Sequence, residues 1–152
     1  MKLRYLLCIS LLIFLISIPF VCAEEFDVAG HSFEIPKGYS VNVTSDNSTT
    51  LVCDNNTNYS LFIIAGELQD TELAKSSRQN AGFKFLSDEN FTAENNITVN
   101  RQNFLKNESY FMFYSFDVDE TSFLMGYVMP MDDDSVNGED NPAIKVIESV
   151  DS

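Results

Sequence analysis

Asparagines placed two residues before a serine or threonine are the most distinctive chemical feature of this sequence. Residues 24–152 contain 14 Asn and 22 Ser or Thr, from which chance predicts roughly two Asn-x-Ser/Thr sites. Seven occur, at Asn42, Asn47, Asn55, Asn58, Asn90, Asn96 and Asn107. Three of them alternate with Val, Phe or Ile and so face solvent in a strand, and the other four fall in predicted turns. The excess is typical of a glycosylated protein, and an Asn-rich surface without glycans is the alternative.

The residue types that build catalytic or metal centres form no recognisable pattern. His31 is the single histidine, lies in a predicted hairpin turn and has no further zinc ligands at a recognisable spacing. The sequence contains neither a Gly-x-Ser-x-Gly turn nor a glycine-rich phosphate loop. Its 23 acidic residues allow many carboxylate pairs of the kind that glycosidases use, but nothing singles out one pair. We therefore predict no catalytic residue, no metal site and no cofactor.

An acidic segment over 132–140 matches the first half of a calcium-binding loop. Oxygen-bearing side chains alternate from Asp133 to Asn137, and Gly138 permits the sharp turn that such a loop needs. The twelfth position of the loop would be Ile144 instead of a glutamate. A solvated acidic loop is the prediction, and weak cation binding is the alternative.

The segment 1–23 has the layout of a secretory signal. Two basic residues precede an uncharged, apolar stretch over 5–21, and small residues stand before a cleavage point between Ala23 and Glu24. We predict cleavage there, so that the chain is secreted. The alternative is an uncleaved anchor that holds the chain on the extracellular face of the cytoplasmic membrane, because about 17 apolar residues are near the lower limit for crossing roughly 30 Å of hydrocarbon.

The exported part, 24–152, is long enough for one domain with its own hydrophobic core. Two of the nine basic residues lie in the leader and all 23 acidic residues follow it, so seven positive and 23 negative side chains give a net charge of −16. This charge argues against nucleic acids and anionic lipid surfaces as partners, because the electrostatic attraction that drives such binding has the wrong sign.

One cysteine remains after export. Cys8 and Cys22 belong to the leader, so Cys53 has no partner for an internal disulfide. It ends an apolar run that begins at Leu51, which predicts a buried, small hydrophobic residue. An intermolecular disulfide or a reactive thiol is the alternative, although no basic neighbour in sequence would lower the pKa of the thiol.

Alternation of apolar and polar residues predicts strands in the first half of the exported part. In chain order these are a hairpin of 26–28 and 33–35, a strand over 41–44, a strand over 49–53 and an apolar, central strand over 59–64. Asp70 then caps a helix that is predicted to end near Gly82. The apolar stripe of this helix is thin, which predicts that it lies on a sheet; it consists of Leu73, Ala74 and Ala81.

Strands and a second helix are predicted in the remainder. The strands are expected around 91–93 and 97–99, and over 110–116 and 122–129. Asn141 caps a final helix whose first residue is Pro142 and whose apolar face is Ile144, Ile147 and Val150. The sequence therefore predicts a single α+β domain, an antiparallel sheet with one mid-chain helix and one C-terminal helix packed on it, after an N-terminal signal helix.

The segment 110–116 is the richest in aromatic residues. Tyr110, Met112, Tyr114 and Phe116 share one face of the predicted strand, and aromatic side chains also occupy the opposite face. A core strand covered on both sides is the prediction, and an exposed aromatic groove for a ligand or partner is the alternative.

Short motifs bracket the predicted domain. The opening Phe-Glu-Ile-Pro-Lys-Gly-Tyr over 33–39 and the closing Asn-Pro-Ala-Ile-Lys-Val-Ile-Glu-Ser-Val over 141–150, together with the order of elements, resemble the PsbP-like and DcrB-like exported domains and small secreted archaeal proteins of unknown role. The resemblance covers most of 26–150. It implies the same α+β fold and carries no catalytic residues with it.

These observations favour a noncatalytic exported or cell-surface domain that binds an unknown protein or envelope partner. A carboxylate-dependent hydrolase acting outside the membrane and an assembly helper for an exported complex are the alternatives. The oligomeric state is left open by the sequence.

Overall fold

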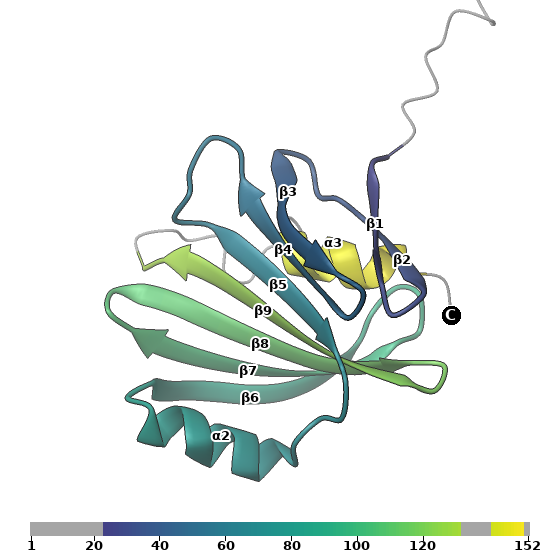
Figure 1. The fold of residues 1–152 in the computed structure, drawn as a ribbon. Helices are drawn as coiled ribbons and strands as arrows, with labels where there is room; N and C mark the ends of the chain where they lie inside the picture. The colour runs from purple at the N-terminus through teal and green to yellow at the C-terminus, as the bar shows by residue number, and fades with distance from the viewer. Residues whose placement is uncertain (1–22, 132–140, 151–152) are drawn as a thin grey trace, which may run out of the picture.

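The structure, a computed structural model, describes residues 23–131 and 141–150 and has an α+β architecture (Figure 1). An antiparallel sheet is combined with two helices, as the sequence predicts. The predicted signal helix and the calcium-like loop over 132–140 lie outside the described residues.

A hairpin and a seven-stranded sheet contain all the strands of the described part. The hairpin consists of β1 (Glu25–Val28) and β2 (His31–Glu34), as predicted. The sheet consists of β3 (Tyr39–Ser45), β4 (Ser48–Cys53), β5 (Ser60–Ala65), β6 (Lys84–Thr92), β7 (Thr98–Lys106), β8 (Ser109–Val118) and β9 (Thr121–Pro130).

The strand order is β3-β4-β5-β9-β8-β7-β6, and every neighbouring pair is antiparallel. Two meanders, β3–β5 and β6–β9, are joined where β5 pairs with β9 and Ile63 lies opposite Met125. The predicted central position of β5 is therefore confirmed, and β3 and β6 form the two edges.

Strands β6 and β7 are longer than the sequence predicts. The apolar residues near 91–93 and 97–99 mark only the ends next to their turn, and the rest of both strands is rich in polar residues. These residues pair across the strands: Asn100 Nδ2 donates to Asp88 Oδ1 over 2.7 Å and to Asn90 Oδ1 over 3.1 Å. Cross-strand hydrogen bonds thus stabilise strands that hydrophobic alternation does not reveal.

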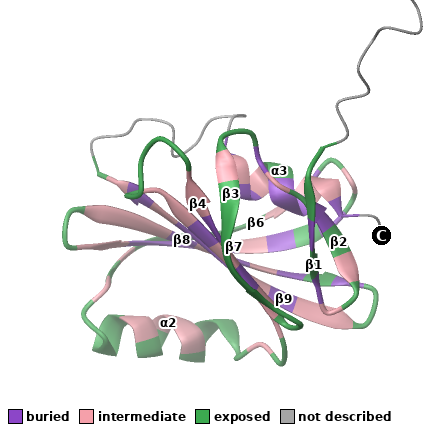
Figure 2. Cartoon of the chain, turned by 45° about the horizontal axis from the view of Figure 1, so that its top comes forward, coloured by how far each residue is buried: buried purple, intermediate pink, exposed green. Residues whose placement is uncertain are grey.

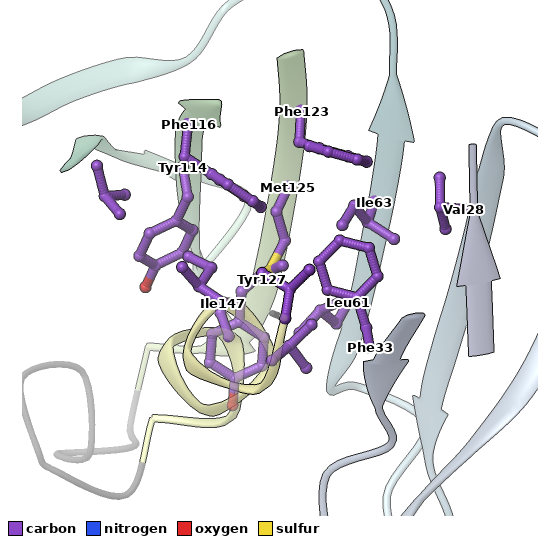
Figure 3. Close-up of a cluster of buried hydrophobic side chains, with 14 of the residues drawn as sticks. Val28, Phe33, Leu61, Ile63, Tyr114, Phe116, Phe123, Met125, Tyr127 and Ile147 are labelled. Carbon is purple, nitrogen blue, oxygen red and sulfur yellow. The ribbon is translucent and has the colours of Figure 1, made fainter. Parts of the chain in front are cut away.

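The main hydrophobic core lies on one face of the sheet, beneath the β1–β2 hairpin and the C-terminal helix (Figure 3). Phe33 of the hairpin contacts Phe123 of β9 edge-on, with 5.4 Å between ring centroids, and Tyr114 and Ile147 are completely buried. Each such side chain contributes about 1.5–3 kcal/mol by leaving water. This burial holds the hairpin, the sheet and the helix together.

Helix α3 (Pro142–Ser149) covers this core. Asn141 caps it as predicted: its Oδ1 accepts from the amide of Ala143 over 2.9 Å. The predicted apolar face is confirmed, because Ile147 and Val150 are buried and Ile144 is half-buried against the core. Ala143 and Val146 are buried as well, so the buried face is wider than the sequence predicts.

Helix α2 (Thr71–Asn80) lies on the opposite side of the sheet, next to β6 (Figures 1 and 2). Asp70 Oδ1 accepts from the amides of the first turn, as predicted. The predicted apolar stripe is wrong, because no residue of α2 is buried and Leu73 is 57% exposed. Ala74, Lys75 and Arg78 are the half-buried residues of the helix, so two long basic side chains form much of its contact with the sheet.

Gly126 leaves space for the Phe62 ring on the α2 side of the sheet. It lies on β9 opposite Phe62 of β5, whose ring covers it, and a Cβ on residue 126 would overlap that ring. A glycine at this point therefore lets Phe62 lie flat on the sheet.

We predict that Asn141→Ala lowers the free energy of unfolding by about 2–3 kcal/mol. The change removes the cap of α3 and the 3.0 Å hydrogen bond from Asn141 Nδ2 to the buried Tyr114 hydroxyl. Urea denaturation followed by far-UV circular dichroism measures the loss. Asn141→Ser is the control: it keeps a capping oxygen but is too short to reach Tyr114, so it should recover about half of the loss. Equal stability of Asn141→Ala and wild type would contradict this account.

We also predict that Gly126→Ala destabilises the domain by about 1–3 kcal/mol, because the new methyl group displaces the Phe62 ring. A double-mutant cycle checks the cause. In a Phe62→Ala background the same substitution should change the free energy of unfolding by less than about 0.5 kcal/mol. An equal loss in both backgrounds would show that Phe62 is not the obstacle.

Candidate functional site

Six phenylalanines form a second cluster on the α2 side of the sheet, separate from the main core. Their rings are linked by contacts with centroid separations of 5.0–6.3 Å, and we call this cluster the aromatic face; its members are Phe62, Phe83, Phe85, Phe104, Phe111 and Phe113. Only Phe104 is buried, and the other five are half-buried. The prediction that the strand over 110–116 is covered on both sides is therefore wrong, because α2 covers the second side only in part.

Three basic side chains lie over these rings. Lys75 Nζ is 4.5 Å from the centroid of Phe85, and Lys106 Nζ is 4.4 Å from that of Phe83. The guanidinium carbon of Arg78 is 4.0 Å from the centroid of Phe113. A cation over an aromatic face is attracted by about 0.5–1 kcal/mol at exposed sites. Three of the seven basic residues that follow the leader thus gather on one face of an acidic domain.

Arg78, like the two lysines, is half-buried. One of its amino groups donates to Gln102 Oε1 over 2.5 Å, and Gln102 in turn donates to Asp88 Oδ2 over 3.0 Å. Within the described ranges no carboxylate forms an ion pair with Arg78. Burial accordingly lowers the pKa of the Arg78 guanidinium. In this part of the chain the guanidinium contacts a phenylalanine ring and the Gln102 amide, and no acidic side chain neutralises its charge.

A cavity of about 160 Å³ opens beside Arg78, between α2 and the sheet. Its apolar walls come from the end of β5, the segment that leads into α2, α2 itself and β9; they are Ile64, Leu68, Ala74 and Leu124. Ser115 of β8 and the backbone around Gly66 complete the lining, together with the exposed Glu67 and Gln69. The cavity therefore combines a cation with apolar walls.

The positive charge of Arg101, the second arginine of the described part, is balanced by a carboxylate. Arg101 lies on the core side of β7, and its Nε and one amino group both donate to Glu89 Oε1, over 2.9 and 2.6 Å. Burial alone would lower the pKa of Arg101, but the hydrogen bonds with Glu89 and the neighbouring Tyr114 outweigh it and raise the pKa. Burial raises the pKa of Tyr114, whose hydroxyl accepts from Asn141. This polar cluster links β6, β7, β8 and α3 and is structural in character.

The seven glycosylation candidates are all exposed. Two lie on the edge strands β3 and β6 and five in turns or loops, and they are Asn42, Asn47, Asn55, Asn58, Asn90, Asn96 and Asn107. Their predicted exposure is confirmed, and their modification stays a prediction. The expected cleavage point also lies in exposed chain, because Ala23 and Glu24 precede the first strand.

The remaining single residues take structural places. His31 begins β2, with its ring edge against Phe123 at 5.4 Å and its Nε2 3.2 Å from Thr121 Oγ1. Cys53 ends β4 and is half-buried, so the predicted full burial of this residue is not observed. Strand β4 is next to the edge strand β3, where fewer side chains cover the sheet. Asp133 and Asn137 of the calcium-like segment lie outside the described residues.

Acidic residues in the described ranges do not form a catalytic pair of the glycosidase kind. Every Asp and Glu there is exposed except Glu148, which is half-buried. A general acid needs burial to raise its pKa towards neutrality, and no carboxylate of these ranges has it. Nor do three His, Cys, Asp or Glu side chains gather there as metal ligands would. In the same ranges no helix is long and apolar enough to cross a membrane.

From the sequence, an exposed aromatic groove on 110–116 was only the alternative, and Arg78 and the phenylalanines that the other elements contribute were missed. A signal was present, because Phe83 and Phe85, and Phe111 and Phe113, each alternate with the strand period. The strand pairing that places Phe104 between these two pairs is not visible in the sequence, and neither is the crossing of α2 over them.

Comparison with known proteins assigns no family. No protein-family model and no curated protein matches the chain. A crystal structure from Bacteroides thetaiotaomicron VPI-5482, at 1.50 Å resolution, is similar with a TM-score of 0.47 and 12% sequence identity. The likeness covers 86% of this chain and 48% of that one, so the chain spans about half the length of its structural neighbour. At this identity and TM-score the likeness supports no statement about function.

Proposed function

We propose that the chain is a noncatalytic exported or cell-surface domain that binds a protein or envelope partner through its aromatic face. The observation that carries the proposal is the cluster of five half-buried phenylalanines with three cations on their rings. Partly exposed aromatic residues next to arginine are enriched in binding surfaces, because they bury much apolar area with little loss of conformational freedom.

The charge distribution of the domain indicates which kind of partner surface fits the aromatic face. The exported part carries a net charge of −16, so its surface as a whole repels acidic molecules. Lys75, Arg78 and Lys106 make the aromatic face the exception. A partner surface that is apolar and carries carboxylates therefore fits this face, and the surrounding negative charge disfavours other orientations.

The positions of the glycosylation candidates support the proposal that the aromatic face is the binding surface. None of the seven asparagines lies on α2, β5, β8 or β9, which contribute to the cavity lining and carry three rings of the face, Phe62, Phe111 and Phe113. Asn90 lies on the edge strand β6, which also carries Phe85. Glycans on the edge strands and loops would leave the cavity and these three rings accessible. Such placement fits a domain that works outside the cell and keeps one surface free for contact.

Two other functions remain as alternatives. A role as an assembly helper for an exported complex agrees with the resemblance to PsbP-like and DcrB-like domains. This role differs from our proposal only in the partner, which would be a component of that complex. A carboxylate-dependent hydrolase would need a pair of acids at a set separation, with one of them buried. The exposure of the described carboxylates makes this the weaker alternative.

We predict that the protein purified from its native host has the mass of a chain that begins at Glu24, increased by the mass of attached glycans. Intact-mass spectrometry measures both, and Asn47→Gln should remove one glycan increment if that site is used. A soluble cytosolic chain that retains Met1 and carries no sugar would contradict export.

We predict that a photo-crosslinker on the aromatic face captures one partner. Substitution of Phe111 by p-benzoylphenylalanine places the reactive ketone there, and the native host supplies the partner. The matched control carries the same group at Phe91, which is also half-buried but packs against the core side. We expect a single discrete adduct from the Phe111 variant, absent from the Phe91 variant. Adducts of equal yield from both positions, or none from Phe111, would reject the aromatic face as the binding surface.

A further inference from the structure

The cavity beside Arg78 has the chemistry of a defined binding site. Four apolar side chains line it together with Arg78; they are Ile64, Leu68, Ala74 and Leu124. Ligand sites in proteins typically combine apolar walls with a few polar groups that fix orientation. The volume of about 160 Å³ admits a single ring or a short branched chain.

Arg78 presents unused hydrogen-bond donors to this site. A guanidinium has five N–H groups, and they point outward in its own plane. The guanidinium carbon of Arg78 lies 4.0 Å from the centroid of Phe113, and one donor is directed to Gln102. An arginine has further N–H groups in a planar fork, whose geometry matches a carboxylate.

The charge of Arg78 also lacks the compensation that Arg101 has. Arg101, which is more deeply buried than Arg78, donates two hydrogen bonds to one carboxylate, that of Glu89. Arg78 is half-buried in a domain with 23 acidic residues, and yet no acid of the described ranges pairs with it. A bound anion would supply the missing partner and regain what burial takes from the charged form.

We propose that this cavity binds a carboxylate attached to a compact apolar group, with the carboxylate on Arg78 and the apolar group between α2 and β9. The inference rests on the proposed function in that the same face makes contact with the partner, and it names the chemical group that the face recognises. A small monocarboxylic acid and the C-terminal residue of a peptide chain both offer this chemistry. The exposed Glu67 at the rim disfavours a second negative charge on the ligand.

Isothermal titration of the full exported chain with benzoate tests the site. We expect a dissociation constant on the order of 1 mM, because the ligand has few atoms, and at least tenfold weaker binding of the neutral isostere benzamide. Arg78→Met keeps the aliphatic stem and removes the charge, so it should weaken benzoate binding at least tenfold. Lys84→Met is the matched control: it removes an exposed cation of β6 that neither lies over the aromatic face nor lines the cavity, and it should leave affinity within twofold.

A second variant tests the apolar half of the site with Arg78 intact. Leu124→Phe fills the cavity and should abolish benzoate binding, while far-UV circular dichroism reports that the sheet is retained. Methyl resonances of Ala74 and Leu124 should shift on addition of benzoate in the wild-type chain. A short peptide ending in leucine, compared with its C-terminal amide, separates the two ligand sources: tighter binding of the free acid than of benzoate assigns the site to a chain terminus, and the reverse order assigns it to a small acid.

Equal binding of benzoate and benzamide, or benzoate binding that survives Arg78→Met, would overturn the inference. So would the absence of binding to the wild-type chain at 50-fold above the expected dissociation constant, which is about 50 mM. This failure is distinct from failure of the proposed function, because photo-crosslinking through position 111 does not require the cavity. A discrete adduct without benzoate binding would retain the binding face and remove the carboxylate site.

Discussion

The alternation of side chains along the β8–β9 hairpin is the constraint on which both sides of the molecule depend. Met112 and Tyr114 point into the main core, whereas Phe111 and Phe113 point to the aromatic face. Since neighbouring residues of a strand must point in opposite directions, a strand this rich in aromatic residues cannot bury all of them on one side. The core side is sealed by the β1–β2 hairpin and α3. Among the described residues, α2 alone covers part of the other side, and the partly exposed rings there are the ones that our functional proposal uses.

Electrostatic compensation separates the structural arginine from the candidate binding arginine. Arg101 has its carboxylate and joins three strands and α3 through Glu89, Tyr114 and Asn141. Arg78 has rings and one amide, and its pKa is lowered by burial. Removing a charge from water without an opposite charge is unfavourable, so such a site gains more from binding an anion than an already paired site does. In our proposal, this local exception in a strongly acidic domain is the source of the selectivity of the aromatic face.

Much of the fold follows from local patterns. The β1–β2 hairpin, the β8–β9 pair and the cap at Asn141 were predicted from alternation and capping chemistry, because these features depend on residues that are close in sequence. The polar parts of β6 and β7 were not predicted. Their stability comes from pairs such as Asn100 with Asp88, which lie twelve residues apart and meet only through strand pairing. The stripe of α2 was mispredicted around Leu73 for a similar reason: the helix packs on phenylalanine rings, which favour the basic side chains of Lys75 and Arg78.

The sequence by itself determined the leader-like segment, the negative charge, the α+β class and the positions of the seven candidate asparagines, since each of these depends on composition or on short spacing. Only the tertiary structure decided which side of β8 stays partly open, where α2 crosses the sheet, and that no carboxylate of residues 23–131 and 141–150 pairs with Arg78. These properties arise when β5, α2, β8 and β9 meet, and residues such as Ile64, Arg78 and Leu124 become neighbours only then. Contacts between distant segments are set by packing of the whole sheet, and no local pattern encodes them.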